Sequence, residues 1–326
     1  MKRIHALAVL VLLSVTAAAA DAQTVTLRYH WTKGESRAYR VTTRTDSTIT
    51  GMPSPTGAPS GPVTVSQSMT QVLKFTADEV ASDGAVTLRQ TFQSIKLESS
   101  GPMGKIVIDS AVPGTADDPM AQGMRKLLDA MVGESVTIDM APDGVVRRVE
   151  GASRIADKIA KIVAADPSTG GAAQGLRSQL SDEALKSALE QTFPRLALPP
   201  VKVGDSWSGQ LAMGNPAIGR ITGRSIFTLK AIEGTPEAPL ARLAISLTLR
   251  QDVVPLPSGP ANMVMTLGAD ARGAGEILFE ASKGQIQKST MRTDLPSSVV
   301  MNGPDGAPAT VNNKTTITMT MESVDK

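Results

Sequence analysis

The sequence contains no cysteine among its 326 residues. This absence excludes disulfides, thiolate nucleophiles and cysteine-ligated metal sites. It also excludes the lipid anchor of exported bacterial lipoproteins, which is attached to a cysteine. Stability must therefore come from a hydrophobic core and from a hydrogen-bonded backbone.

Histidine is scarce, and neither sign of charge dominates. The chain has two histidines, and 33 Lys and Arg stand against 31 Asp and Glu. Balanced charge argues against a nucleic-acid partner, which favours a basic face. A lone His30 without other soft ligands does not make a structural zinc site. Because no phosphate loop or dinucleotide fingerprint is present either, we predict no metal and no cofactor.

The first 22 residues have the order of a secretory signal peptide. Lys2 and Arg3 precede an apolar run over residues 4–15, and small residues follow up to a cleavage site that would leave Gln23 first. The apolar run is too short to span a bilayer comfortably, and no later stretch is as apolar. We therefore expect a soluble protein, secreted or periplasmic, without a membrane span after cleavage. An uncleaved N-terminal anchor is the alternative.

Residues 23–116 have the pattern of β-strands. Val25, Leu27, Tyr29 and Trp31 alternate with polar residues, which is typical of a half-buried strand and places His30 on the opposite side. Residues 51–62 are rich in Pro, Gly and Ser and predict a loop. Strands are expected at 63–80 and 85–97, joined by a short Asp-Gly turn.

Residues 117–195 contain three amphipathic helices and a hairpin at 136–149. The first helix begins at Pro119 and ends before Gly133, the second ends ahead of Pro167, and the third begins after Ser181 and ends before Pro194. Each helix has an apolar side that must lie against something apolar. Residues 196–326 return to strands, which we expect to form a β meander.

Helices grouped in the middle of the chain, rather than alternating with strands, indicate an α+β class. We predict a single domain over residues 23–326. Its large curved antiparallel sheet carries about three amphipathic helices packed on one face.

One short block has the residue types of a hydrolase. Gly204-Asp205-Ser206 is similar to the nucleophile block of a family of esterases and lipases, in which the serine needs a histidine base and a carboxylate. His30 is the histidine that remains after signal cleavage, and it precedes the serine instead of following it. We therefore interpret the block as a Gly-Asp turn that starts a strand anchored by Trp207, and we predict no catalytic residues.

Methionine is common where aromatic residues are few: 15 Met against five Phe, two Tyr and two Trp. Methionine side chains are soft and adaptable, so they suit a cavity for an apolar ligand as well as a curved core. The residues predicted to line such a cavity come from the first helix and the C-terminal strands: Met120, Met124, Leu127, Met131, Met263, Met265 and Met291, with Met319 beside them.

Two motifs carry a resemblance. Gly144-Val145-Val146 through Gly151, and the Pro-x-x-x-Val-Gly-Asp-x-Trp block between Pro199 and Trp207, resemble a family of exported bacterial proteins of unknown function. The similarity spans nearly all of the mature chain. The family has no established catalytic residues, so the resemblance implies none here.

Export without catalytic equipment favours a non-enzymatic binding or scaffold protein of the cell envelope. Its partner would be an apolar small molecule or another envelope protein. The competing hypothesis is a serine-dependent, esterase-like hydrolase that uses Ser206 and His30.

Overall fold

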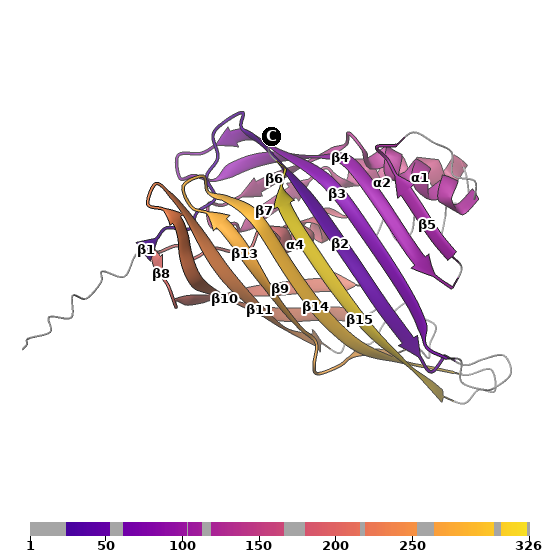
Figure 1. Cartoon of the computed structure of the whole chain (residues 1–326). Coiled ribbons are helices and arrows are strands. Elements are labelled where there is room, and N and C mark those ends of the chain that lie inside the picture. The colour runs from indigo at the N-terminus through magenta and orange to yellow at the C-terminus, as the bar shows by residue number, and fades with distance from the viewer. Residues whose placement is uncertain are drawn as a thin grey trace, which may run out of the picture.

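The computed structural model describes residues 24–52, 61–102, 104–112, 119–165, 180–215, 219–252, 264–302 and 308–324. The predicted signal peptide lies outside these residues. Figure 1 shows a broad curved sheet with the helices behind it. The predicted class, a large antiparallel sheet with a few helices, is confirmed.

Strands account for most of the described chain. Those of the N-terminal part and the central hairpin are β1 (Thr24–Val25), β2 (Ser36–Thr50), β3 (Val63–Val80), β4 (Val86–Gly101), β5 (Gly104–Asp109), β6 (Ser135–Met140) and β7 (Val146–Glu150). Those of the C-terminal part are β8 (Val201–Lys202), β9 (Ser206–Asn215), β10 (Gly219–Thr235), β11 (Ala238–Asp252), β12 (Val264–Leu267), β13 (Arg272–Glu280), β14 (Gln285–Asn302) and β15 (Pro308–Ser323).

Thirteen of these strands form one antiparallel sheet. Its order is β7-β6-β4-β3-β2-β15-β14-β13-β11-β10-β9, with β5 added to β4 and β12 added to β14. The centre of the sheet joins the two ends of the chain, because β2 pairs with β15 from Tyr39 opposite Ser323 to Thr50 opposite Asn312. The N-terminal and C-terminal strands are therefore parts of the same sheet.

The two faces of the sheet differ in burial. We call the face that carries Tyr39, Phe75 and Met321 the inner face, because these side chains are buried in the main core together with residues of the helices. The opposite, outer face is in contact with solvent. Side chains alternate between the faces at successive residues, so each strand contributes every second residue to the core.

Three helices lie in the described part of the chain: α1 (Pro119–Met131), α2 (Ala152–Ala165) and α4 (Asp182–Thr192). Ser181 caps α4 as predicted, since its hydroxyl accepts the N–H of Ala184 at 3.1 Å. None of the three is long and apolar enough to cross a membrane.

The two edge strands of the sheet are both covered by α4. This helix contacts β7 at one edge and β9 at the other, while α1 contacts β5 and α2. The sheet is therefore bent far enough for a single helix to span the opening between its edges. We call this opening the seam.

An extended N-terminal segment, residues 24–34, crosses the end of the sheet; we call it the strap. Only Thr24–Val25 pair as a strand, with β8, but the predicted alternation is confirmed because Val25, Leu27, Tyr29 and Trp31 are buried. Its backbone N–H groups donate to distant turns: Tyr29 to Pro142 at 2.8 Å and His30 to Gly284 at 3.3 Å. The strap thus links both halves of the sheet.

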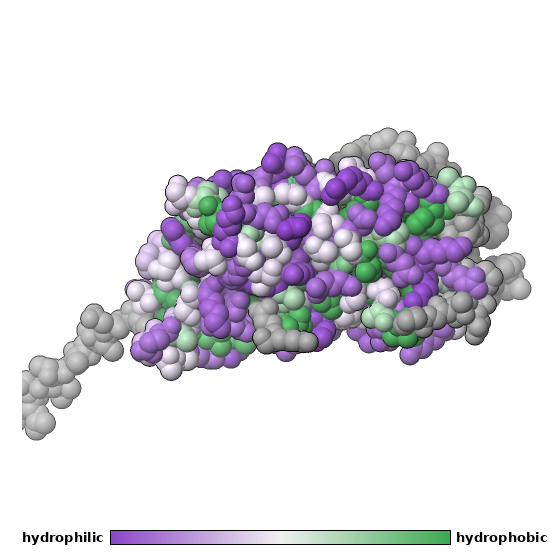
Figure 2. All heavy atoms as spheres, turned by 90° about the horizontal axis from the view of Figure 1, so that it is seen from above, coloured by the Kyte–Doolittle hydropathy of each residue, from purple (hydrophilic) through white to green (hydrophobic). Residues whose placement is uncertain are grey.

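Viewed from above, the molecule is elongated, and hydrophilic residues are spread over this face with apolar residues in small groups between them (Figure 2). This distribution is that of an ordinary solvated surface. The unusual surface is the inner face of the sheet.

Candidate functional site

The inner face changes from core to open surface along its strands. Ser289, Met321 and Val41 are paired across neighbouring strands, and all three are buried. Two residues further along the same strands, the inner-face side chains are only half-buried. The helices and the strap therefore cover one end of the inner face and leave the rest partly open.

At this boundary lies a line of directly paired residues that we call the methionine row. Its members follow one another across β14, β15, β2, β3 and β4: Met291, Met319, Thr43, Met69 and Leu97. The three methionines pack against the main core without being buried in it, and Gln71 Nε2 donates to the sulfur of Met69 at 3.3 Å. Unbranched thioether side chains at such a place can adapt to a ligand of irregular shape.

Beyond the methionine row the described inner-face side chains of these strands are uncharged, and most of them are polar. We call these positions the polar rows: Thr293, Ile317, Thr45, Gln67 and Ser99 first, then Leu295, Thr315, Ser47 and Val65, then Ser297, Asn313, Ile49 and Val63. The hydroxyls of Ser47 and Thr315 share a hydrogen bond at 2.9 Å.

The outer face of the same strands carries ion pairs. Arg44 Nε lies 2.8 Å from Asp46, Arg292 lies 3.1 Å from Asp294, and Lys288 lies 2.6 Å from Glu322. Hydrogen bonds from Arg44 and Ser66 lower the pKa of Asp46, so this carboxylate stays ionised at neutral pH. Apart from the buried Arg37, the described side chains of these central strands are thus charged on the outer face alone.

Part of the predicted cavity lining belongs to the main core or packs against it. Leu127 and Met131 of α1 are buried in the main core, and Met124 and Met291 pack against that core. Met291 belongs to the methionine row, while α1 lies against β5 at the other end of the row. Met263 lies outside the described residues, as do the side chains of Met120 and Met265. That these residues line a ligand cavity stays a prediction.

Met69 was missed from the sequence. The sequence nevertheless indicated its position. Met69 is separated from Leu73 and Phe75 by an even number of residues in one strand, so the three side chains share a face.

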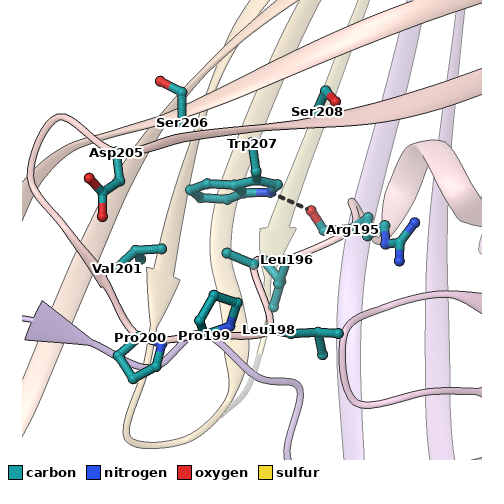
Figure 3. Close-up of a pocket in the computed structure, with 11 residues that line it drawn as sticks. Arg195, Leu196, Leu198, Pro199, Pro200, Val201, Asp205, Ser206, Trp207 and Ser208 are labelled. Carbon is teal, nitrogen blue, oxygen red and sulfur yellow. Dashed lines mark hydrogen bonds between the residues drawn. The ribbon is translucent and has the colours of Figure 1, made fainter.

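A pocket of about 530 Å³ lies at the seam, between the segment 195–201 and the start of β9 (Figure 3). The indole of Trp207 forms one wall; its Nε1 donates to the carbonyl of Arg195 at 2.9 Å, and its ring stacks on Phe227. Leu198, which is half exposed, and the two prolines Pro199 and Pro200 form the opposite wall. None of the residues predicted to line an apolar cavity belongs to this pocket.

The turn before β9 explains the Gly-Asp-Ser block structurally. Gly204 has a φ of +97°, and Asp205 closes the turn by accepting the N–H of Lys202 at 3.0 Å. Ser206 and Ser208 point away from the Trp207 side of the strand (Figure 3). The hydroxyl of Ser206 pairs with Thr228 Oγ1 at 2.9 Å, whereas the backbone of His30 is bonded to Gly284. This arrangement is the anchored turn that the sequence predicted.

The residues just before the two motifs of the family resemblance meet at the seam. Leu196 N–H donates to the carbonyl of Asp143 at 2.8 Å, and the Arg195 guanidinium lies 3.3 Å from the Asp143 carboxylate. Gly144 has a φ of +88°, and a Cβ there would lie 2.6 Å from the ring of Tyr29. Asp143, Arg195 and Leu196 therefore connect the turn before β7 with the segment before β9.

Tyr29 completes this junction. Its hydroxyl donates to the carbonyl of Pro194 at 3.1 Å. Burial raises the pKa of this phenol well above its ordinary value, and Tyr39 and Asp143 raise it further, so Tyr29 stays a neutral donor. At this junction Tyr29, Arg195 and Leu196 all have hydrogen-bond or ion-pair partners, so the junction has a structural role.

The family comparison agrees with the sequence. Residues 83–237 match a family of unknown function, DUF6263. Both motifs named above lie within this stretch, so the resemblance to a family of unknown function is confirmed for residues 83–237. The predicted similarity over nearly all of the mature chain reaches beyond the residues that match. The export of its members stays a prediction. A search of curated proteins found no match.

Two solved structures align with most of the chain at low similarity. Lipovitellin aligns with 88% of this chain at 12% sequence identity and a TM-score of 0.41, and the chain spans 25% of that lipovitellin chain. DynF from the dynemicin pathway of Micromonospora chersina aligns with 92% of this chain and 85% of its own, at 8% identity and a TM-score of 0.19. Both TM-scores are low, so we describe the fold by the strand order of this chain and not by either structure.

Proposed function

We propose that the protein is an exported, non-enzymatic binding protein that holds an apolar ligand against the inner face of its sheet. The observation that carries this proposal is the methionine row. Met291 and Met319 are directly paired, Met69 lies in the same row beyond Thr43, and all three are half-buried where the helical cover of the sheet ends. A face that only had to be solvated would not place adaptable apolar side chains there.

The test is binding of N-phenyl-1-naphthylamine, a neutral apolar dye whose fluorescence rises in apolar surroundings. We expect Met319→Lys to weaken dye binding about tenfold or more, because an unpaired charge at the row must be desolvated by the dye. Thr318→Lys is the matched control, since Thr318 is the neighbouring residue on the outer face.

Both variants must unfold at the same urea concentration for the comparison to hold. Equal dye binding by the wild-type protein and Met319→Lys would show that the row is not the binding site. The absence of dye binding to the wild-type protein would reject an apolar ligand altogether.

The non-enzymatic part of the proposal has its own test. Among the described residues, no group of three or more histidine, aspartate and glutamate side chains could hold a metal ion, and the Ser206 hydroxyl is bonded to that of Thr228. We expect the wild-type protein and Ser206→Ala to hydrolyse p-nitrophenyl butyrate no faster than buffer. Hydrolysis by the wild-type protein that Ser206→Ala abolishes would establish the hydrolase instead.

A further inference from the structure

The charge on the long central strands is confined to one face. Past Arg37, which belongs to the network of the strap, none of the described inner-face side chains of these strands is charged. This holds for four stretches: Tyr39–Ile49 in β2, Val63–Ala77 in β3, Ser289–Val299 in β14 and Ala309–Ser323 in β15.

Strand propensity does not explain this difference. Threonine is enriched in strands, and it occurs on both faces here. The outer face of the same strands nevertheless carries Arg44, Asp46, Arg292 and Asp294 among its hydroxyl residues. The polar rows hold hydroxyl, amide and aliphatic side chains and no charged one.

One polar atom on the inner face lacks a partner. Asn313 Oδ1 is buried and accepts no hydrogen bond within the described structure. Asn313 lies opposite Ile49 on one side and Ser297 on the other, two residues from Thr315 on the same face. A buried acceptor without a donor is costly, and a donor brought by a ligand would remove that cost.

We propose that the inner face binds an uncharged amphiphile, with its alkyl chain on the methionine row and a hydroxyl-bearing head group on the polar rows. This proposal rests on the proposed function and specifies its ligand class. A head group of this kind exchanges its hydrogen bonds to water for bonds to Thr45, Thr293 and Asn313. A carboxylate or phosphate would lose hydration there and meet no cation in return.

Three probes with the same oleoyl chain separate these cases: 1-monooleoylglycerol, oleate and 1-oleoyl-lysophosphatidate. Each is titrated, below its critical aggregation concentration, against N-phenyl-1-naphthylamine bound to the wild-type protein. We expect monooleoylglycerol to bind about tenfold more tightly than either anion, because the anions must be desolvated against an uncharged face.

Asn313→Leu tests where the head group lies. This variant should weaken monooleoylglycerol binding several-fold while dye binding stays unchanged, because the dye has no hydroxyl to donate. Asn312→Leu, on the exposed outer face of the same strand, is the control and should change neither.

The outcomes are distinguishable. Dye binding together with equal or tighter binding of the anions would overturn the neutral head group and leave the proposed function standing. Unchanged monooleoylglycerol affinity in Asn313→Leu would overturn the placement of the head group on the polar rows. Failure of every probe, the dye included, would overturn the proposed function itself.

Discussion

At the scale of single residues, Arg37 is the most constrained charge in the molecule's described part. Its side chain is 4% exposed. The guanidinium donates to Glu35 at 2.6 Å and to the carbonyls of Gly284 at 3.1 Å and Lys283 at 3.0 Å, and it lies 4.0 Å from the centre of the Trp31 ring. The planar guanidinium thereby donates hydrogen bonds to the turn between β13 and β14 and also contacts the strap.

Removing this guanidinium should destabilise the fold strongly. We expect Arg37→Leu to lower the free energy of unfolding by about 3 kcal/mol, because Glu35 and two buried carbonyls lose their donor. Urea denaturation followed by circular dichroism measures the change. Arg40→Leu, an exposed arginine on the outer face of the same strand, should cost far less, and equal losses in the two variants would contradict this account.

Glu35 illustrates how local partners outweigh burial. Burial alone would raise its pKa, but hydrogen bonds from Arg37 and Thr32 lower the pKa below that of an ordinary glutamate. Its contribution to stability is therefore present at neutral pH and is lost as the pH falls through the lowered pKa.

At the scale of elements, the segment from Arg195 to Trp207 matters because β9 is an edge strand that must be held in place. The indole of Trp207 donates across the pocket to the Arg195 carbonyl, and Leu196 is bonded to the turn before β7. A bond on each side of the segment fixes the position of β9 relative to β7.

Trp207→Phe should therefore reduce stability by about 1 to 3 kcal/mol. It removes the indole donor and leaves the Arg195 carbonyl without that bond, while much of the stacking on Phe227 remains. Thermal unfolding checks the value. Ser206→Ala next to it removes only an exposed hydroxyl, so a drop as large as that of Trp207→Phe would count against the anchoring role of the indole.

Local signals predicted most elements. Ser181 and Pro194 marked the limits of α4, and the pattern around the Asp-Gly turn marked the hairpin of β6 and β7. A strand that starts at the Gly-Asp turn and is anchored by Trp207 was predicted, and it is β9; its end was not predicted, because its sequence contains glycines and lacks a clear alternation. Its pairing with β10 is not visible in a local pattern.

At the scale of the whole molecule, the candidate site could not be predicted as a unit. Parity within a strand assigns Met69, Met291 and Met319 to the inner face one at a time. Their alignment in one row depends on the register between strands far apart in the sequence, above all that of Met319 opposite Thr43. The hypothesis of a methionine-lined site was available from composition, but its geometry was not.

The pairing of β2 with β15 has a consequence for how the molecule is made. A chain that emerges from its N-terminus, whether from a ribosome or from a translocation channel, exposes β2 long before residues 308–323 arrive to cover its free side. Such an uncovered strand is open to pairing with other chains. We therefore expect maturation to depend on holding chaperones until synthesis or passage is complete.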